Sequence, residues 1–201
     1  HVGVGGMGGL DLKRVSSHSG VEVAALCDVD ANILKEAAAK FPNARTFRDY
    51  REMISMMGDT IDACVVSTPD HTHAPAAMTA MNHGKPVYCQ KPLTHEVFEA
   101  RQLRLVADKK RLVTQMGIQA SAGLPYRRAT QMIQSGVIGK VNRVLAWSYK
   151  NWGYDGPVFT KFDDIPKNLD WDLWLGTAAI RSFKKGVYHR GAWRKQIEIG
   201  R

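Results

Sequence analysis

The chain has 201 residues, of which 44% are hydrophobic and 23% are charged, a balance typical of a folded globular protein. The net charge of +9 is scattered and no nucleic-acid motif accompanies it, so we expect no nucleic-acid partner. No apolar stretch approaches the roughly 18 residues of a membrane-spanning helix, which predicts no membrane partner. The chain has three cysteines, Cys27, Cys64 and Cys89, whose odd number and spacing favour buried free thiols over disulfides or a metal site. Free thiols indicate a reducing, cytoplasmic compartment, with an exported form left open.

Residues 1–119 alternate short apolar runs with helix-forming segments, the pattern of a doubly wound parallel α/β sheet. Asp30 and Asp49 stand where helix N-caps are needed. Strands are expected at 21–27, 44–47, 61–67, 85–89 and 112–116, and helices at 10–20, 31–41, 50–57, 73–84 and 94–111.

The composition changes after residue 119. Residues 1–119 carry 14 basic and 13 acidic side chains, whereas 120–201 carry 14 and 6 and hold all five tryptophans. This shift predicts a dinucleotide-binding domain at 1–119 and the incomplete start of an α+β substrate or oligomerisation domain at 120–201. A helix at 126–136 and a half-buried strand at 140–150 are expected there, followed by a long Pro/Gly/Asp-rich loop of the kind that lines or covers a site.

The first ten residues, "HVGVGGMGGL", hold glycines at the spacing G-x-G-x-x-G. Such a loop lets a pyrophosphate approach the backbone at the start of a helix. Asp28 follows the strand at 21–27, where a carboxylate accepts hydrogen bonds from an adenosine ribose and repels a 2′-phosphate, which favours NAD over NADP. No Arg stands beside Asp28 in the sequence to offset it. The cofactor contacts expected here are Gly3, Gly5, Gly6, Met7, Gly8 and Asp28.

Two later stretches, "STPDHTHAP" and "YCQKPLTH", complete a recognisable set of motifs. With the glycine loop they resemble the glucose–fructose oxidoreductase and inositol dehydrogenase family, Gfo/Idh/MocA, in which T-P-N-x-x-H follows one strand and E-K-P the next. The resemblance implies a Rossmann-type fold, and it implies that these stretches supply Thr68, Pro69, His73, Lys91 and Pro92 to the cofactor site. Lys91 would also contact the substrate hydroxyl as the catalytic residue, as a partly desolvated amine, and Pro92 is a candidate for a cis bond.

The resemblance implies an NAD-dependent oxidoreductase that moves a hydride between nicotinamide and a hydroxyl of a sugar, cyclitol or related substrate. An NAD-dependent glycosidase of the same family and a non-catalytic dinucleotide-binding protein remain open as alternatives. Substrate contacts are expected from Lys91 and Gln119. Trp152 and Tyr154 are further candidates, because aromatic rings stack on sugars, although packing under the loop or at an oligomer interface explains them equally well.

The chain also departs from the family pattern. Gln90 replaces the usual Glu, and Asp70 and Ile118 replace residues that are often Asn. The second domain of the family carries a D-x-x-x-H element as general base, and residues 120–201 hold no such spacing. Only two residues precede the glycine loop, and the strand at 140–150 lacks partners. We therefore expect an internal fragment of a homo-oligomeric parent protein, which binds cofactor weakly or not at all and does not turn over.

Overall fold

The computed structural model describes residues 1–149 and 152–200. Its sheet contains only parallel pairs, and the single residue Val2 bridges both Cys27 and Val66, which joins the pair β1-β2 to the triplet β3-β4-β5. The order β2-β1-Val2-β3-β4-β5 therefore runs outward in both directions from Val2, as in a doubly wound Rossmann sheet. The strands are β1 (Ala25–Cys27), β2 (Arg45–Phe47), β3 (Cys64–Val66), β4 (Val87–Gln90) and β5 (Thr114–Gly117).

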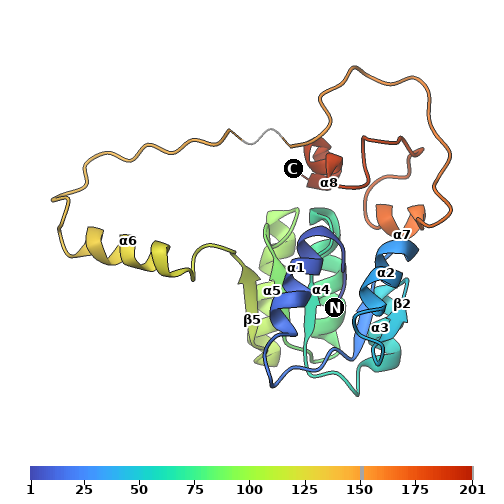
Figure 1. Cartoon of the computed structure of the whole chain (residues 1–201), viewed down its shortest axis with the longest axis horizontal. Coiled ribbons are helices and arrows are strands. Elements are labelled where there is room, and N and C mark those ends of the chain that lie inside the picture. Colours follow the sequence, from blue (N-terminus) through green and yellow to red (C-terminus); the bar gives the residue numbers. More distant parts are fainter. Residues whose placement is uncertain (150–151, 201) are drawn as a thin grey trace.

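Helices cover both faces of this sheet, and alternation along β1 shows how the two cores are divided (Figure 1). Leu26 packs with α1 (Gly6–Val15) and α2 (Ala31–Ala38), whereas its neighbours Ala25 and Cys27 face the opposite core. That larger core is closed by three helices, α3 (Tyr50–Met57), α4 (His73–Asn82) and α5 (Val97–Lys110). The Rossmann-type fold expected from the sequence is confirmed.

Local capping explains why several helices begin where the sequence predicts. The carboxylate of Asp30 accepts hydrogen bonds from the first turn of α2, with Asn32 N at 2.9 Å, and Asp49 accepts from Arg51 N at 2.8 Å. Helix α5 begins with a capping box formed by Glu96 and Glu99. A short 3₁₀ turn, η1 (Asp70–Thr72), leads from β3 into α4.

The prediction of a strand at 140–150 is wrong for the residues that the structure describes there. Residues 140–149 form no strand and are exposed, with Val144 80% and Tyr149 90% accessible, and Lys150 lies outside the described residues. The preceding helix α6 (Leu124–Gln134) has no buried residue. Figure 1 shows α6 projecting away from the sheet and residues 140–149 running back as an extended stretch that stays clear of it. Alternating hydrophobicity makes a strand only where a neighbouring strand supplies a hydrogen-bonded ladder, and residues 140–149 join no sheet of the described residues.

Residues 152–200, here named the returning segment, fold back onto the carboxyl ends of the strands (Figure 1). Its elements are α7 (Trp171–Leu175), η2 (Ala192–Lys195) and α8 (Ile197–Gly200). They enclose a core in which Trp171 stacks on Trp174 at 4.8 Å between ring centroids. Two backbone hydrogen bonds fasten the segment beside β1, from Asp170 N to Val29 O at 3.0 Å and from Ala31 N to Asn168 O at 2.8 Å.

The three cysteines lie in β1, β3 and β4, where all are buried and free, so the expectation of buried free thiols is confirmed. Within the described residues no helix is both long and apolar enough to cross a bilayer. The division into domains at residues 119 and 120 stays a prediction.

Candidate functional site

The glycine loop makes a close turn that requires glycine at two positions, Gly3 and Gly8. Gly3 has φ +78°, and a Cβ on it would lie 2.7 Å from the carbonyl oxygen of Ser67. A Cβ on Gly8 would lie 2.0 Å from the carbonyl oxygen of Gly3. Helix α1 begins at Gly6 with no side-chain cap and no acidic residue in its first turn, so its leading N–H groups and positive dipole end can face an anion.

Asp28 lies beside this loop, immediately after β1, and is buried. One carboxylate oxygen accepts from Val4 N at 2.9 Å and the other from Asp30 N at 3.0 Å. Burial raises the pKa of Asp28, and these two hydrogen bonds only partly oppose it. Each carboxylate oxygen keeps a second lone pair, so the group can still accept hydrogen bonds from ligand hydroxyls.

A cavity of about 910 Å³ opens between the glycine loop and the returning segment. The returning segment contributes Trp174, His189, Arg190, Trp193 and Arg194 to its wall. Seven predicted cofactor residues line it, namely Gly3, Gly5, Gly6, Met7, Asp28, Thr68 and Pro69. The cavity thus lies at the carboxyl ends of β1 and β3, where the strand order reverses and doubly wound sheets bind their ligands.

The remaining cofactor candidates lie outside this wall. Gly8 packs behind the loop, against Gly3 and Ser67. His73 is buried, with Nε2 2.8 Å from Thr68 O and Nδ1 2.6 Å from Pro92 O, so its ring links the loops that follow β3 and β4. Burial lowers the pKa of His73, and the two carbonyl contacts oppose that shift.

Lys91 and Pro92 form the turn after β4. The peptide bond between them is cis, as expected for Pro92. Lys91 is exposed in this structure, and the expected desolvation of its amine beside a nicotinamide stays a prediction. Its roles in catalysis and in binding cofactor and substrate stay predictions.

The structure also places the three other substrate candidates outside the cavity wall. The amide of Gln119 donates to Gln90 Oε1 at 2.6 Å. Arg194 stacks over the ring of the half-exposed Trp152, 5.3 Å from its centroid. The Tyr154 hydroxyl donates to Pro157 O at 2.8 Å within its own loop. Their contact with substrate stays a prediction.

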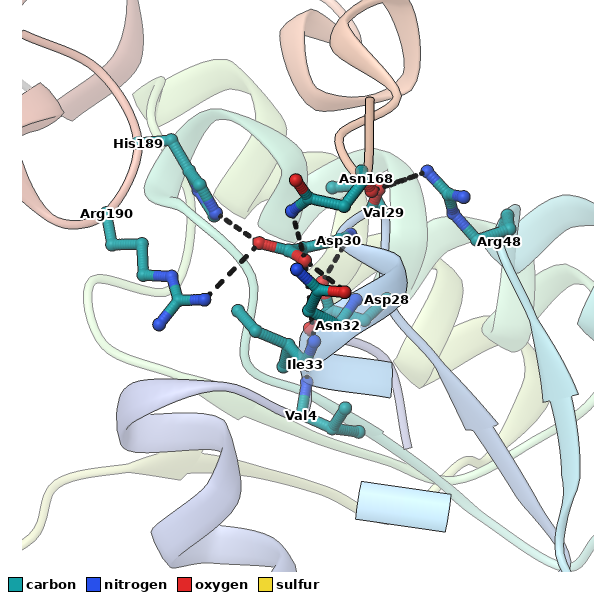
Figure 2. A network of polar contacts seen from close by, with 10 residues as sticks. All are labelled: Val4, Asp28, Val29, Asp30, Asn32, Ile33, Arg48, Asn168, His189 and Arg190. Atoms are coloured by element: carbon teal, nitrogen blue, oxygen red, sulfur yellow. Dashed lines mark hydrogen bonds and ion pairs between the residues drawn. The ribbon is translucent and has the colours of Figure 1, made fainter. Parts of the chain in front are cut away.

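Asp30 anchors the returning segment, a role that its N-cap position does not reveal (Figure 2). Its carboxylate accepts from Asn168 Nδ2 at 2.7 Å and lies 2.9 Å from His189 Nε2. Arg190 Nη2 lies 3.6 Å from the same carboxylate. Burial opposes ionisation of Asp30, but the hydrogen bonds from His189, Asn168 and α2 outweigh it and lower the pKa.

The returning segment therefore brings cationic side chains into the cavity that holds Asp28. Arg190 lines this cavity with His189, although no Arg stands near Asp28 in the sequence.

Asp70 carries a second perturbed carboxyl. Burial raises its pKa to about 6, with partial compensation from the positive charges of Arg194, Lys91 and His95.

The sequence profile of a family described as "Oxidoreductase family, NAD-binding Rossmann fold" (GFO_IDH_MocA) matches residues 1–118, more than half of the chain. The chain belongs to the Gfo/Idh/MocA family. This confirms the resemblance drawn from the glycine loop and the motifs at Thr68–His73 and Gln90–Pro92.

Individual relatives agree with this membership. Inositol 2-dehydrogenase of Salmonella paratyphi B is 31% identical over 143 residues, which cover 69% of this chain and 42% of the relative. The crystal structure of myo-inositol 2-dehydrogenase from Lactobacillus plantarum matches with a TM-score of 0.65 and 29% identity, over 70% of this chain and 41% of that one. GenD2 from gentamicin A biosynthesis, solved in complex with NAD, matches with a TM-score of 0.61 and 29% identity, over 65% and 37%. The matched residues thus span less than half of each of these relatives.

In this Gfo/Idh/MocA chain, sequence reasoning missed the cavity residues that the returning segment supplies. His189 and Asp30 are 159 positions apart, so no local pattern pairs them. The only sequence signal was compositional, since residues 120–201 are basic and hold every tryptophan, including Trp174 and Trp193 on the cavity wall.

Proposed function

We propose that this protein is an NAD-dependent oxidoreductase that transfers a hydride between nicotinamide and a carbinol carbon of a sugar, cyclitol or related substrate. The observation that carries the proposal is the cavity, in which the glycine loop, Asp28 and Thr68-Pro69 meet at the reversal of the strand order. Membership of an NAD-binding oxidoreductase family supports it, as do relatives that are inositol 2-dehydrogenases.

The residues on the cavity wall fit a dinucleotide. A pyrophosphate would lie against the N–H groups of the loop and of the first turn of α1, which a Cβ at Gly3 or Gly8 would disrupt. Asp28 would hold the adenosine ribose, and its carboxylate would disfavour a 2′-phosphate. Bound NAD supplies the hydride acceptor.

Lys91 would orient the substrate hydroxyl by donating a hydrogen bond from its ammonium group. It follows β4, next to β3 in the sheet, so its turn borders the loop that carries Thr68 and Pro69. The ring of His73 holds these two turns together through its contacts with Thr68 O and Pro92 O. A homo-oligomeric state and a cytoplasmic location remain part of this proposal.

The first test is titration with NADH and, separately, NADPH, with tryptophan excited and energy transfer to the reduced nicotinamide recorded. Trp174 and Trp193 line the cavity, so a bound nicotinamide cofactor lies within transfer distance of both. Because residues of this chain already form the cavity, we expect binding where the sequence alone predicts weak binding or none, with saturable energy transfer to NADH at lower concentration than to NADPH. Asp28→Asn should reduce this preference, while Asp62→Asn, a matched change at an exposed position, should leave it unchanged.

Absence of energy transfer to either cofactor would contradict the cavity assignment, and equal affinity for both cofactors in the parent chain would contradict the role of Asp28. Turnover is tested with NAD and myo-inositol, with Lys91→Ala as the variant. The sequence predicts no sustained turnover by this chain, so any slow turnover of the parent chain should be lost in Lys91→Ala. Turnover that survives Lys91→Ala would refute its catalytic role. Net NADH accumulation distinguishes a dehydrogenase from a glycosidase that recycles bound NAD.

A further inference from the structure

A buried polar cluster behind the glycine loop connects α1 with the ends of three strands. Asp11 of α1 and Gln90 at the end of β4 are each only 4% exposed. The carboxylate oxygen Oδ2 of Asp11 accepts from Gln90 Nε2 at 2.7 Å and from the Ser67 hydroxyl at 3.0 Å. Gln90 Oε1 accepts from Lys91 N at 3.2 Å and from Gln119 Nε2 at 2.6 Å.

Chemistry fixes the orientation of the Gln90 amide. The backbone N–H of Lys91 can only donate, so the side-chain oxygen of Gln90 must face it. The ionised carboxylate of Asp11 can only accept, so the NH₂ group of Gln90 must face Asp11. Position 90 therefore needs one acceptor and one donor on the same planar group. Glutamine provides both, whereas an ionised glutamate provides acceptors alone.

We propose that Asp11 and Gln90 act as a charge-matched pair of positioning residues, which hold the backbone of Lys91 and the side chain of Gln119 in register with the helix that follows the glycine loop. The role assigned to Lys91 rests on the proposed function; the pairing itself does not. The pair explains why Gln90 stands where the family pattern has Glu, because a second carboxylate at this distance from Asp11 would be strongly repelled.

Two titratable groups outside the pair lie close to it in every variant: Asp70, whose pKa burial raises to about 6 and whose charge is coupled to that of Lys91, and His73, which contacts the carbonyls of Thr68 and Pro92. Burial, followed by the charge of Asp11, raises the pKa of Tyr88 above its usual range near 10. The charge of Arg14 acts on the same phenol, and Lys91 directly follows Gln90 in the chain. Because the parent chain and all variants share these groups, only the difference from the parent's pH profile is attributed to coupling between Asp11 and a carboxyl group introduced at position 90.

The test is a double-mutant cycle of Gln90→Glu, Asp11→Asn and the combined variant, with urea unfolding followed by circular dichroism at pH 5 to 8. In Gln90→Glu the two carboxyl groups must share a proton, so the folded-state pKa of one rises above its unfolded value near 4. Its stability is therefore retained at low pH and lost as pH rises through the folded-state pKa. In the combined variant the amide introduced at position 11 can donate to the carboxylate introduced at position 90, so we expect the parent's pH profile to return.

Positioning of Lys91 has its own readout, the hydrogen exchange of its backbone amide. Gln90→Leu removes the acceptor and should speed this exchange. The proposal is overturned if Gln90→Glu follows the parent's pH profile, if the combined variant is no more stable than Gln90→Glu, or if Lys91 exchange is unchanged. If the parent chain fails to bind NADH, the proposed function is refuted. The double-mutant cycle still tests the pairing of Asp11 with Gln90 in that case.

Discussion

Replacement of Asp30 should detach the returning segment before the sheet unfolds. Asp30→Ala removes an N-cap, worth about 1 kcal/mol. It also removes charge-assisted hydrogen bonds with Asn168 and His189, each worth about 1.5 kcal/mol or more. The first loss falls on α2 and the second on the contact between the segment and the sheet. We therefore expect a total destabilisation of about 4 kcal/mol, most of it in docking.

The assay uses the placement of the tryptophans. All five lie at residue 147 or beyond, so their fluorescence reports the later part of the chain, while far-ultraviolet circular dichroism is dominated by helices α1 to α5. In Asp30→Ala the fluorescence transition should move to lower urea and precede the circular dichroism transition. Asp30→Asn keeps an N-cap but loses the charge, so it should give an intermediate separation.

Asp49→Ala is the matched control, because Asp49 caps α3 in the same way but, among the described residues, its carboxylate bonds only to Arg51. It should shift both transitions together by about 1 kcal/mol. Coincident transitions in Asp30→Ala, with a loss no larger than that of Asp49→Ala, would refute the anchoring role. The lowered pKa of Asp30 adds a pH test, since its contribution is present above the unfolded value near 4 and lost as pH falls through the folded value.

Three further outcomes follow from the packing and the perturbed groups. Gly8→Ala should cost about 3 kcal/mol or more and abolish NADH binding, because its Cβ would meet the fixed carbonyl of Gly3 at 2.0 Å; unchanged affinity would contradict this. Burial raises the pKa of Asp70 to about 6, so the stability it contributes is present at low pH and lost as pH rises through 6. Asp70→Asn should therefore gain up to about 2 kcal/mol over the parent in urea unfolding at pH 8, and nothing at pH 4. Burial also raises the pKa of Cys27 and Cys89 to about 12, so iodoacetamide at pH 8 should label them only at the rate of unfolding.

Features with a local cause were predictable from the sequence. Helix α3 has the predicted bounds, because Asp49 caps it and its apolar residues follow one helical face. The strands overlap the apolar runs that predict them but are shorter than those runs. The run at 21–27 gives only the three residues of β1, because the ladder ends where β2 and Val2 no longer supply partners.

Features that depend on distant partners were not predictable in this way. The alternation at 140–149 indicated a strand, yet the pattern says nothing about whether a second backbone is within reach. The sequence shows that Gln90 departs from the family pattern, but the partner that accounts for it, Asp11, lies 79 positions earlier. The glycine loop and Asp28 could be assigned, since their spacing follows from strand–loop–helix geometry, whereas His189 and Arg190 reach the same cavity through the fold alone.

The returning segment is both docked on Asp30 and part of the cavity wall, so docking and ligand binding must be thermodynamically linked. A ligand that contacts Trp174 and Trp193 binds the docked form better and stabilises it, by about 2.7 kcal/mol at a hundredfold excess over Kd. That stabilisation is similar to the docking contribution expected from the Asp30 carboxylate. Saturating NADH should therefore bring the fluorescence transition of Asp30→Asn back towards that of the parent chain. The Asp30→Asn variant should also bind NADH more weakly than the parent chain, although the substitution removes no direct contact with NADH. A fluorescence transition that NADH leaves unmoved in the parent chain would show that the segment's wall residues do not contact the nucleotide.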